Sequence, residues 1–129
     1  MLRECRRVLK PGGRLVVASI EVTSGLTGVS RQRALELGPA DVAGEASLRG
    51  LFERARFRVE AERDVTPEFR DALERRLAAL VRFEEELRRS EGDEQVDAER
   101  EKRARMLVGV EEGLLRRTIV LGRSLVAQM

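Results

Sequence analysis

Residues 9–13, Leu-Lys-Pro-Gly-Gly, place a helix end and a turn directly before an apolar run. Proline cannot donate the backbone hydrogen bond of a continuing helix, so the spacing of Leu2, Cys5 and Leu9 predicts a helix that ends by Leu9. The two glycines then allow a turn with positive φ. Residues 15–20, Leu-Val-Val-Ala-Ser-Ile, predict a short strand that is covered on both faces, as in a parallel sheet.

Residues 21–46 are rich in glycine and predict a long loop, interrupted by a short helix over 29–37. Ser47 is placed to cap the next helix, because its side chain can accept a hydrogen bond from the first helical amides. Apolar residues then recur on one face of that helix, at Leu48, Leu51, Phe52 and Ala55. Residues 57–62 alternate strictly between apolar and charged, which predicts a half-exposed strand at a sheet edge.

The second half of the chain predicts two helices and a final strand. Thr66 and Pro67 are expected to begin the first helix, with the hydroxyl as its cap, and this helix is expected to end near Ser90. Its apolar stripe consists of Phe69, Leu73, Leu77, Leu80 and Leu87. A polar turn at 91–94 leads to a helix over 96–115, whose inward positions are Ala104, Leu107, Val110 and Leu114. Residues 118–121, Thr-Ile-Val-Leu, predict a central strand.

These elements predict a single α/β domain with three parts. Residues 1–65 form a strand–helix–strand crossover, 66–115 a helical hairpin, and 116–129 the last strand and a tail. The alternating strand belongs at an edge, whereas the apolar last strand needs a neighbour on each side. Both conditions are met if residues 118–123 lie between the other two strands.

Residues 8–17, Val-Leu-Lys-Pro-Gly-Gly-Arg-Leu-Val-Val, resemble the fifth-strand region of class I S-adenosylmethionine-dependent methyltransferases. The resemblance extends over 1–65 and 116–125. It implies a truncated Rossmann-like sheet of three strands, the last one central and antiparallel, with an inserted helical hairpin. It departs at 55–57, Ala-Arg-Phe, where many relatives have glycine. Because the cofactor half precedes this region in the family, the resemblance implies a carboxyl-terminal part of such an enzyme.

Ligands of open α/β sheets bind beyond the carboxyl ends of the strands. For the first strand this end carries Ser19, Glu21 and Thr23, and the resemblance implies that these residues face a small-molecule methyl acceptor. Glu21 is expected to orient or deprotonate the acceptor, and the two hydroxyls to bind it. The alternative is ordinary loop solvation and capping by the same residues. The helical hairpin leaves the same edge, where it either covers the acceptor like a lid or only completes the core. No catalytic residue is assigned.

The family's cofactor site requires a glycine-rich turn that follows a strand. No Gly-x-Gly-x-Gly occurs here, and Gly12-Gly13 precedes a strand. We therefore expect this chain alone to bind no S-adenosylmethionine and to be inactive, which leaves its status as an enzyme open. Strand 14–20 would lack a partner on one edge, which favours self-association. The competing interpretation is a non-catalytic pseudo-enzyme or interaction module that uses this edge.

Composition argues against several other functions. With 25 basic and 23 acidic residues interleaved, no Trp or Tyr and only four Phe, nucleic-acid binding is disfavoured. The absence of histidine removes the commonest metal ligand and general base, and no metal site is predicted. No apolar run is long enough to span a membrane, and residues 1–7 lack the apolar stretch of a signal peptide. The one cysteine, Cys5, excludes an internal disulfide, and we expect it to be a packing residue in a cytoplasmic protein.

Overall fold

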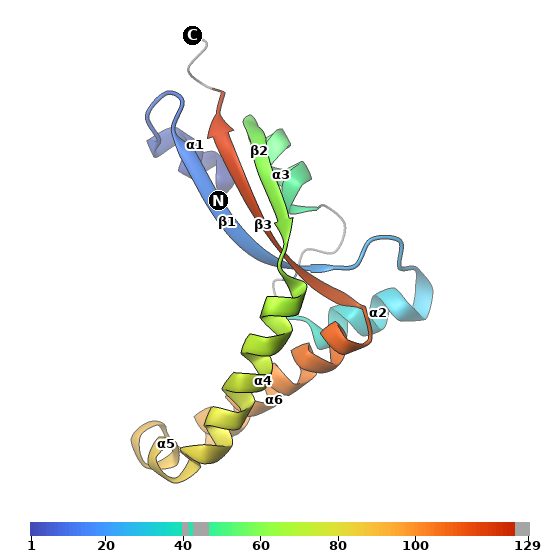
Figure 1. Ribbon diagram of the computed structural model, residues 1–129, viewed down its shortest axis with the longest axis vertical. Coiled ribbons are helices and arrows are strands. Elements are labelled where there is room, and N and C mark those ends of the chain that lie inside the picture. Colours follow the sequence, from blue (N-terminus) through green and yellow to red (C-terminus); the bar gives the residue numbers. More distant parts are fainter. Residues whose placement is uncertain (40–41, 43–46, 126–129) are drawn as a thin grey trace.

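The computed structural model describes residues 1–39, 42 and 47–125 (Figure 1). A three-stranded sheet carries helices on one face, and a helical hairpin extends away from one end of the sheet. In chain order the elements are α1 (Leu2–Val8), β1 (Arg14–Val22), α2 (Gly28–Leu37), α3 (Leu48–Arg54), β2 (Phe57–Asp64), α4 (Thr66–Arg82), α5 (Glu84–Glu91), α6 (Asp93–Glu111) and β3 (Leu115–Ser124).

The sheet has the order β1-β3-β2, with β3 antiparallel to both neighbours. Along β1 the register runs from Arg14 opposite Arg123 to Val22 opposite Leu115. Along β2 it shifts by a bulge between Val59 and Ala61. The predicted α/β fold, with the last strand central and antiparallel, is therefore confirmed. The expected tail 126–129 lies outside the described residues.

One core lies between the sheet and helices α1 and α3. Its largest side chains are Phe52 and Phe57, which are 0% and 1% exposed and whose ring centroids are 5.3 Å apart. Phe52 packs directly on Gly122 of β3, where an added Cβ would come within 2.4 Å of the ring. The absence of a side chain at Gly122 thus lets α3 approach the sheet closely.

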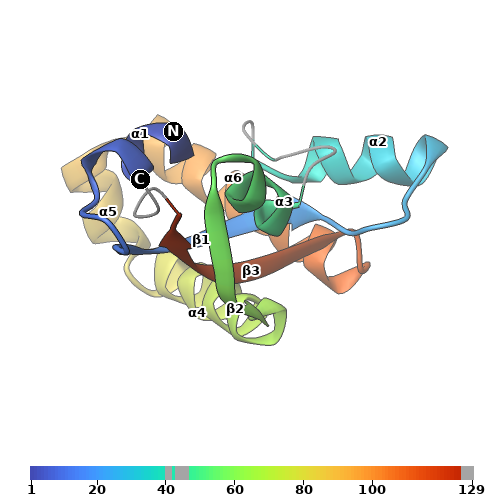
Figure 2. The same cartoon turned by 90° about the horizontal axis from the view of Figure 1, so that it is seen from above.

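A second core joins the hairpin to the other end of the sheet. Phe69 and Leu73 of α4 meet Met106 and Val110 of α6 around Leu115, at the start of β3. Figure 2 shows the sheet from above, with α4 on the side opposite α3. This core covers only the end of that sheet face, and Val16 in β1 remains 62% exposed.

Several local predictions are confirmed. Helix α1 ends at Val8, and Gly12 adopts a φ of +73° in the following turn. The side chain of Ser47 accepts a hydrogen bond from the amide of Gly50 at 3.0 Å, so it caps α3 as expected. A helix interrupts the loop after β1, as α2, although positions 40–41 and 43–46 of that loop lie outside the described residues.

Other local predictions are wrong. β1 extends to Val22 and is not covered on both faces, because no strand or helix of the described chain lies over Val16. Ala104 is exposed; Met106 faces the core instead. At the start of α4, Thr66 is the first helical residue and not the cap: Val65 is the N-cap and makes no side-chain capping hydrogen bond, while the carboxylate of Asp64 accepts from the amide of Thr66 at 2.9 Å.

The helix expected to run from Thr66 to Ser90 is broken at Phe83, whose φ of −106° and ψ of 21° depart from helical values. The chain resumes as α5 and turns at Gly92 into α6, so the polar turn expected over 91–94 is shorter than predicted. The bend brings Arg88 within ion-pair distance of Asp93 and Asp97, at 3.2 and 2.7 Å. These ion pairs join α5 to α6 across the Gly92 turn, and periodicity within a single helix does not predict them.

Candidate functional site

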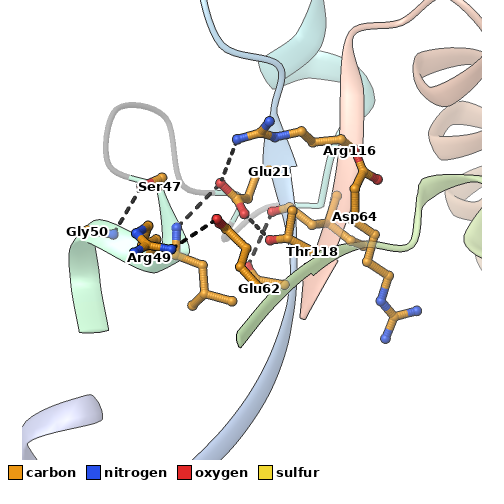
Figure 3. Close-up of polar contacts among 12 residues, drawn as sticks. Glu21, Ser47, Arg49, Gly50, Glu62, Asp64, Arg116 and Thr118 are labelled. Carbon is orange, nitrogen blue, oxygen red and sulfur yellow. Dashed lines mark hydrogen bonds and ion pairs between the residues drawn. The ribbon is translucent and has the colours of Figure 1, made fainter. Parts of the chain in front are cut away.

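Glu21 lies near the carboxyl end of β1, among polar side chains of β2, β3 and α3 (Figure 3). Its side chain is buried, with only 3% exposed. Its carboxylate accepts a hydrogen bond from the hydroxyl of Thr118 on β3 and one of 3.4 Å from the amide of Leu48, the first residue of α3. The guanidinium of Arg116 lies 3.7 Å away. One carboxylate therefore joins two strands and a helix start, which satisfies most of its capacity to accept hydrogen bonds.

The two predicted hydroxyls lie on either side of Glu21 in sequence but have different surroundings. The hydroxyl of Thr23 donates to the carbonyl of Gly113 at 2.7 Å, while the amide of Thr23 donates to Leu114. Thr23 thereby ties the end of β1 to the turn between α6 and β3. Ser19 makes only a long contact of 3.5 Å to the carbonyl of Ile20. Of the three predicted residues, Ser19 therefore has the side chain with the weakest hydrogen bonding.

Ser19 borders a pocket between the carboxyl half of β1 and the hairpin, which we call the β1 pocket. Its volume is about 380 Å³. Three sets of residues line it: Ala18, Ser19 and Ile20 of β1 with Arg117 of β3; Pro39 and Val42 of the loop; and Phe69, Lys102, Arg103 and Met106 of the hairpin. The hairpin thus covers the edge of the sheet at which a ligand was predicted to bind.

Among the described residues that line the β1 pocket there are three cations and no carboxylate. The guanidinium of Arg117 lies over the ring of Phe69, 5.1 Å from its centroid. Arg103 pairs with Glu99 at 2.6 Å, and Lys102 is exposed. None of the three belongs to the predicted site, because they come from a helix and a strand whose meeting no local pattern indicates.

The start of α4 is held against β3 by a short chain of polar contacts. The hydroxyl of Thr66 donates to Asp64 at 2.5 Å and accepts from the amide of Arg117 at 3.0 Å. Both hydrogen bonds from Thr66 favour the ionised carboxyl and hold the pKa of Asp64 below its ordinary value. This arrangement sets the position of Phe69, one turn later, beneath Arg117.

Gly12 and Gly13 do not form the glycine-rich turn of the cofactor site that the resemblance implies. Gly12 and Gly13 form the turn that leads into β1, where the amide of Gly13 donates to the carbonyl of Lys10 at 2.8 Å. They do not follow a strand and do not open a helix, which is the arrangement that presents free amides to such a ligand.

The described residues were also compared with the requirements of a metal site and of a membrane-spanning helix. They include no group of three or more His, Cys, Asp or Glu side chains arranged to hold a metal ion. Among the same residues, no helix is both long and apolar enough to cross a bilayer.

Another cavity, of about 550 Å³, lies at the far end of the hairpin and is bordered by Leu80, Phe83 and Leu87. It is remote from the sheet edge.

No protein-family model matches this chain, and a search of curated protein sequences gives no match either. Solved structures do match it in fold. A Galdieria sulphuraria protein assigned as a sarcosine dimethylglycine methyltransferase superposes with a TM-score of 0.77 at 20% identity, over 99% of this chain and 47% of its own. Phosphoethanolamine N-methyltransferase 2 of Haemonchus contortus, in complex with phosphomonomethylethanolamine and S-adenosylhomocysteine, gives 0.73 at 15% identity, over 95% and 29%.

The cyclopropane synthase MmaA2 of Mycobacterium tuberculosis superposes with a TM-score of 0.69 at 14% identity, over 95% of this chain and 48% of its own. At these identities the likeness establishes the fold, which is that of class I methyltransferases. The chain spans about half or less of the length of these structures.

Proposed function

We propose that this chain is the carboxyl-terminal portion of a class I S-adenosylmethionine-dependent methyltransferase that acts on a small molecule in the cytoplasm. In this proposal it supplies the acceptor side of the active site and is inactive by itself. The observation that carries the proposal is the β1 pocket, which lies at the carboxyl half of β1 beneath a helical hairpin, in a sheet of the methyltransferase type.

The position of the β1 pocket agrees with the general rule for open α/β sheets, whose ligands bind at the carboxyl ends of the strands. Ser19 is the predicted acceptor-binding residue that borders this pocket directly. We propose that Glu21 and Thr23 act indirectly, without contact with the acceptor. They hold the end of β1 against β3 and against the α6–β3 turn. Methyl transfer depends strongly on the orientation of the acceptor, so a rigid β1 end would serve the reaction.

The surface beside β1 supports the view that further sheet is needed for activity. Within the described part of the chain, β1 pairs with β3 and has no strand on its other edge. A second pocket, of about 570 Å³, lies along this strand on the opposite face, between α1 and α3, and is bordered by Leu2, Val17 and Leu48. An additional strand and its helix would fill such a site and bury the free edge of β1.

The first test is cofactor binding. Calorimetry of the 129-residue chain with S-adenosylmethionine should give no heat of binding. Micromolar affinity would contradict the proposal that this chain supplies only the acceptor side of the active site. The second test is genetic: translation of the coding DNA upstream of Met1 should reveal an Asp-x-Gly-x-Gly segment. A polypeptide extended to include that segment should bind the cofactor and methylate small amines or acids, whereas the 129-residue chain should not.

The second candidate function is a non-catalytic interaction module or pseudo-enzyme that self-associates through β1. The unpaired edge of β1, together with the exposure of Val16, favours it. An upstream sequence without any methyltransferase-like segment, combined with a dimer in solution, would support this candidate over the first.

A further inference from the structure

The three cations of the β1 pocket converge from two elements that are distant in sequence. Lys102 and Arg103 come from α6, and Arg117 comes from β3. We propose that this pocket binds the anionic group of the acceptor, a carboxylate or a phosphate, with Lys102 and Arg117 as its direct ligands. The inference rests on the proposed function, since it names the class of molecule that the acceptor side would take.

The charge of Lys102 and Arg117 is not neutralised within the described part of the chain. No carboxylate of the described residues pairs with either side chain within 4.0 Å, and none of them lines the pocket. The charge of Arg103, by contrast, is compensated: Glu99 lies 2.6 Å from Arg103 and also 3.4 Å from Arg76. Two uncompensated cations beside an apolar wall favour an anion that enters from solvent.

Arg117 is positioned before any ligand arrives. Its backbone amide donates to the hydroxyl of Thr66 at 3.0 Å, and its guanidinium lies 5.1 Å from the ring centroid of Phe69, which is itself buried. Stacking leaves the N–H groups at the rim of the guanidinium free to donate. Less conformational entropy is therefore lost when Arg117 binds an anion.

Arg103 contributes from the side. Its Nε is buried and has no hydrogen-bond partner among the described residues, although its terminal nitrogen pairs with Glu99. The remaining wall is apolar, from Ile20, Val42 and Met106, and Ser19 is its neutral polar lining residue among those described. A volume of about 380 Å³ suits a small molecule with one anionic end and one less polar end.

The test uses the ¹⁵N-labelled 129-residue chain and NMR titration, with sodium phosphate and sodium acetate as separate probes at constant ionic strength. We expect saturable shifts at the amides of Ala18, Ser19 and Ile20 and at the side-chain Nε–H of Arg117. The phosphate and acetate arms distinguish the two anion classes by their relative affinity. Choline chloride, a cationic probe, should cause no such shifts.

Two substitutions address the ligands separately. Lys102→Glu reverses an exposed charge and should weaken binding of the preferred anion by about tenfold or more. Arg117→Lys retains the charge but loses the planar donors, and should weaken binding less. Arg105→Gln, on the same helix but outside the pocket, is the matched control and should bind as the unmodified chain does. Circular dichroism establishes that each variant is folded.

The inference is overturned if neither anion causes saturable shifts at these positions, or if Lys102→Glu binds within twofold of the unmodified chain. Its outcome is separable from that of the proposed function, because anion binding here requires no cofactor. Anion binding without cofactor binding by any extended polypeptide would support the pocket and contradict the methyltransferase assignment. The reverse result would contradict the pocket alone.

Discussion

The carboxylate of Glu21 accepts a hydrogen bond from the hydroxyl of Thr118, 97 positions away along the chain. Thr118 lies directly opposite Ser19 in the β1–β3 register, so this bond runs diagonally between the two strands. The same carboxylate receives the first amide of α3 and faces Arg116 (Figure 3). A residue predicted to contact substrate is thus also a junction of the sheet.

Replacement of Glu21 by alanine should destabilise the fold by about 2–4 kcal/mol, because it leaves a buried hydroxyl, a helix-start amide and Arg116 without their shared acceptor. Urea denaturation monitored by circular dichroism measures the change. Thr118→Val tests the pair, since the double variant should lose less than the sum of the two single losses. Glu94→Gln, an exposed residue on α6, is the control and should change stability little. Additive losses would contradict a direct Glu21–Thr118 interaction.

The stability of the α4 start should depend on pH through Asp64. Because the pKa of Asp64 is lowered in the folded state, mainly by the Thr66 hydroxyl, its contribution is present above the unfolded pKa and is lost as pH falls through the folded value. Asp64→Asn should therefore lower the urea midpoint at pH 7, and this difference should shrink below about pH 3.

Asp71→Asn, exposed on α4, provides the comparison for Asp64. An equal deficit of Asp64→Asn at pH 7 and at pH 3 would show that its ionised carboxylate contributes nothing.

The free edge of β1 should drive concentration-dependent association. Val16 is 62% exposed on the uncovered face beside this edge, so Val16→Lys should keep the chain monomeric by placing charge there. Light scattering across a concentration series measures the mass. Val81→Lys is the matched control, because Val81 is 64% exposed but lies on α4. A stable monomer of the unmodified chain at high concentration would count against an adhesive edge.

Gly122 should tolerate no side chain while Phe52 occupies its present position. An alanine Cβ would come within 2.4 Å of the Phe52 ring, so Gly122→Ala should destabilise by about 1–3 kcal/mol through overpacking. Thermal or urea unfolding measures this loss. If the contact is the cause, Phe52→Leu should relieve part of it, and the combined variant should be more stable than additivity predicts. Strict additivity would point to a different origin.

Much of the fold was predictable because its signals are local. The Pro11 break, the glycine turn and the Ser47 cap each depend on the backbone preferences of one or two residues. Strand order followed from hydrophobic alternation, since the exposed pattern at 57–62 suits an edge and the apolar run at 118–121 suits the centre.

The division of the predicted helix into α4 and α5 at Phe83 was harder to predict from the sequence. Arg88 of α5 forms ion pairs with the start of α6, and helical periodicity does not predict such contacts between helices. The exposure of Ala104 has a similar origin. The direction in which α6 faces the core depends on where α4 and Leu115 lie, and Met106 rather than Ala104 points toward them.

The candidate site also contains some features that local sequence patterns predict and others that they do not. Strand direction and chain order are enough to predict that polar residues end β1 and that a helical hairpin leaves the same sheet edge. The burial of Glu21 against Thr118 and the meeting of Lys102 and Arg117 at the β1 pocket follow from the folded arrangement alone. Burial and charge compensation depend on residues brought together across the chain, which no local periodicity encodes.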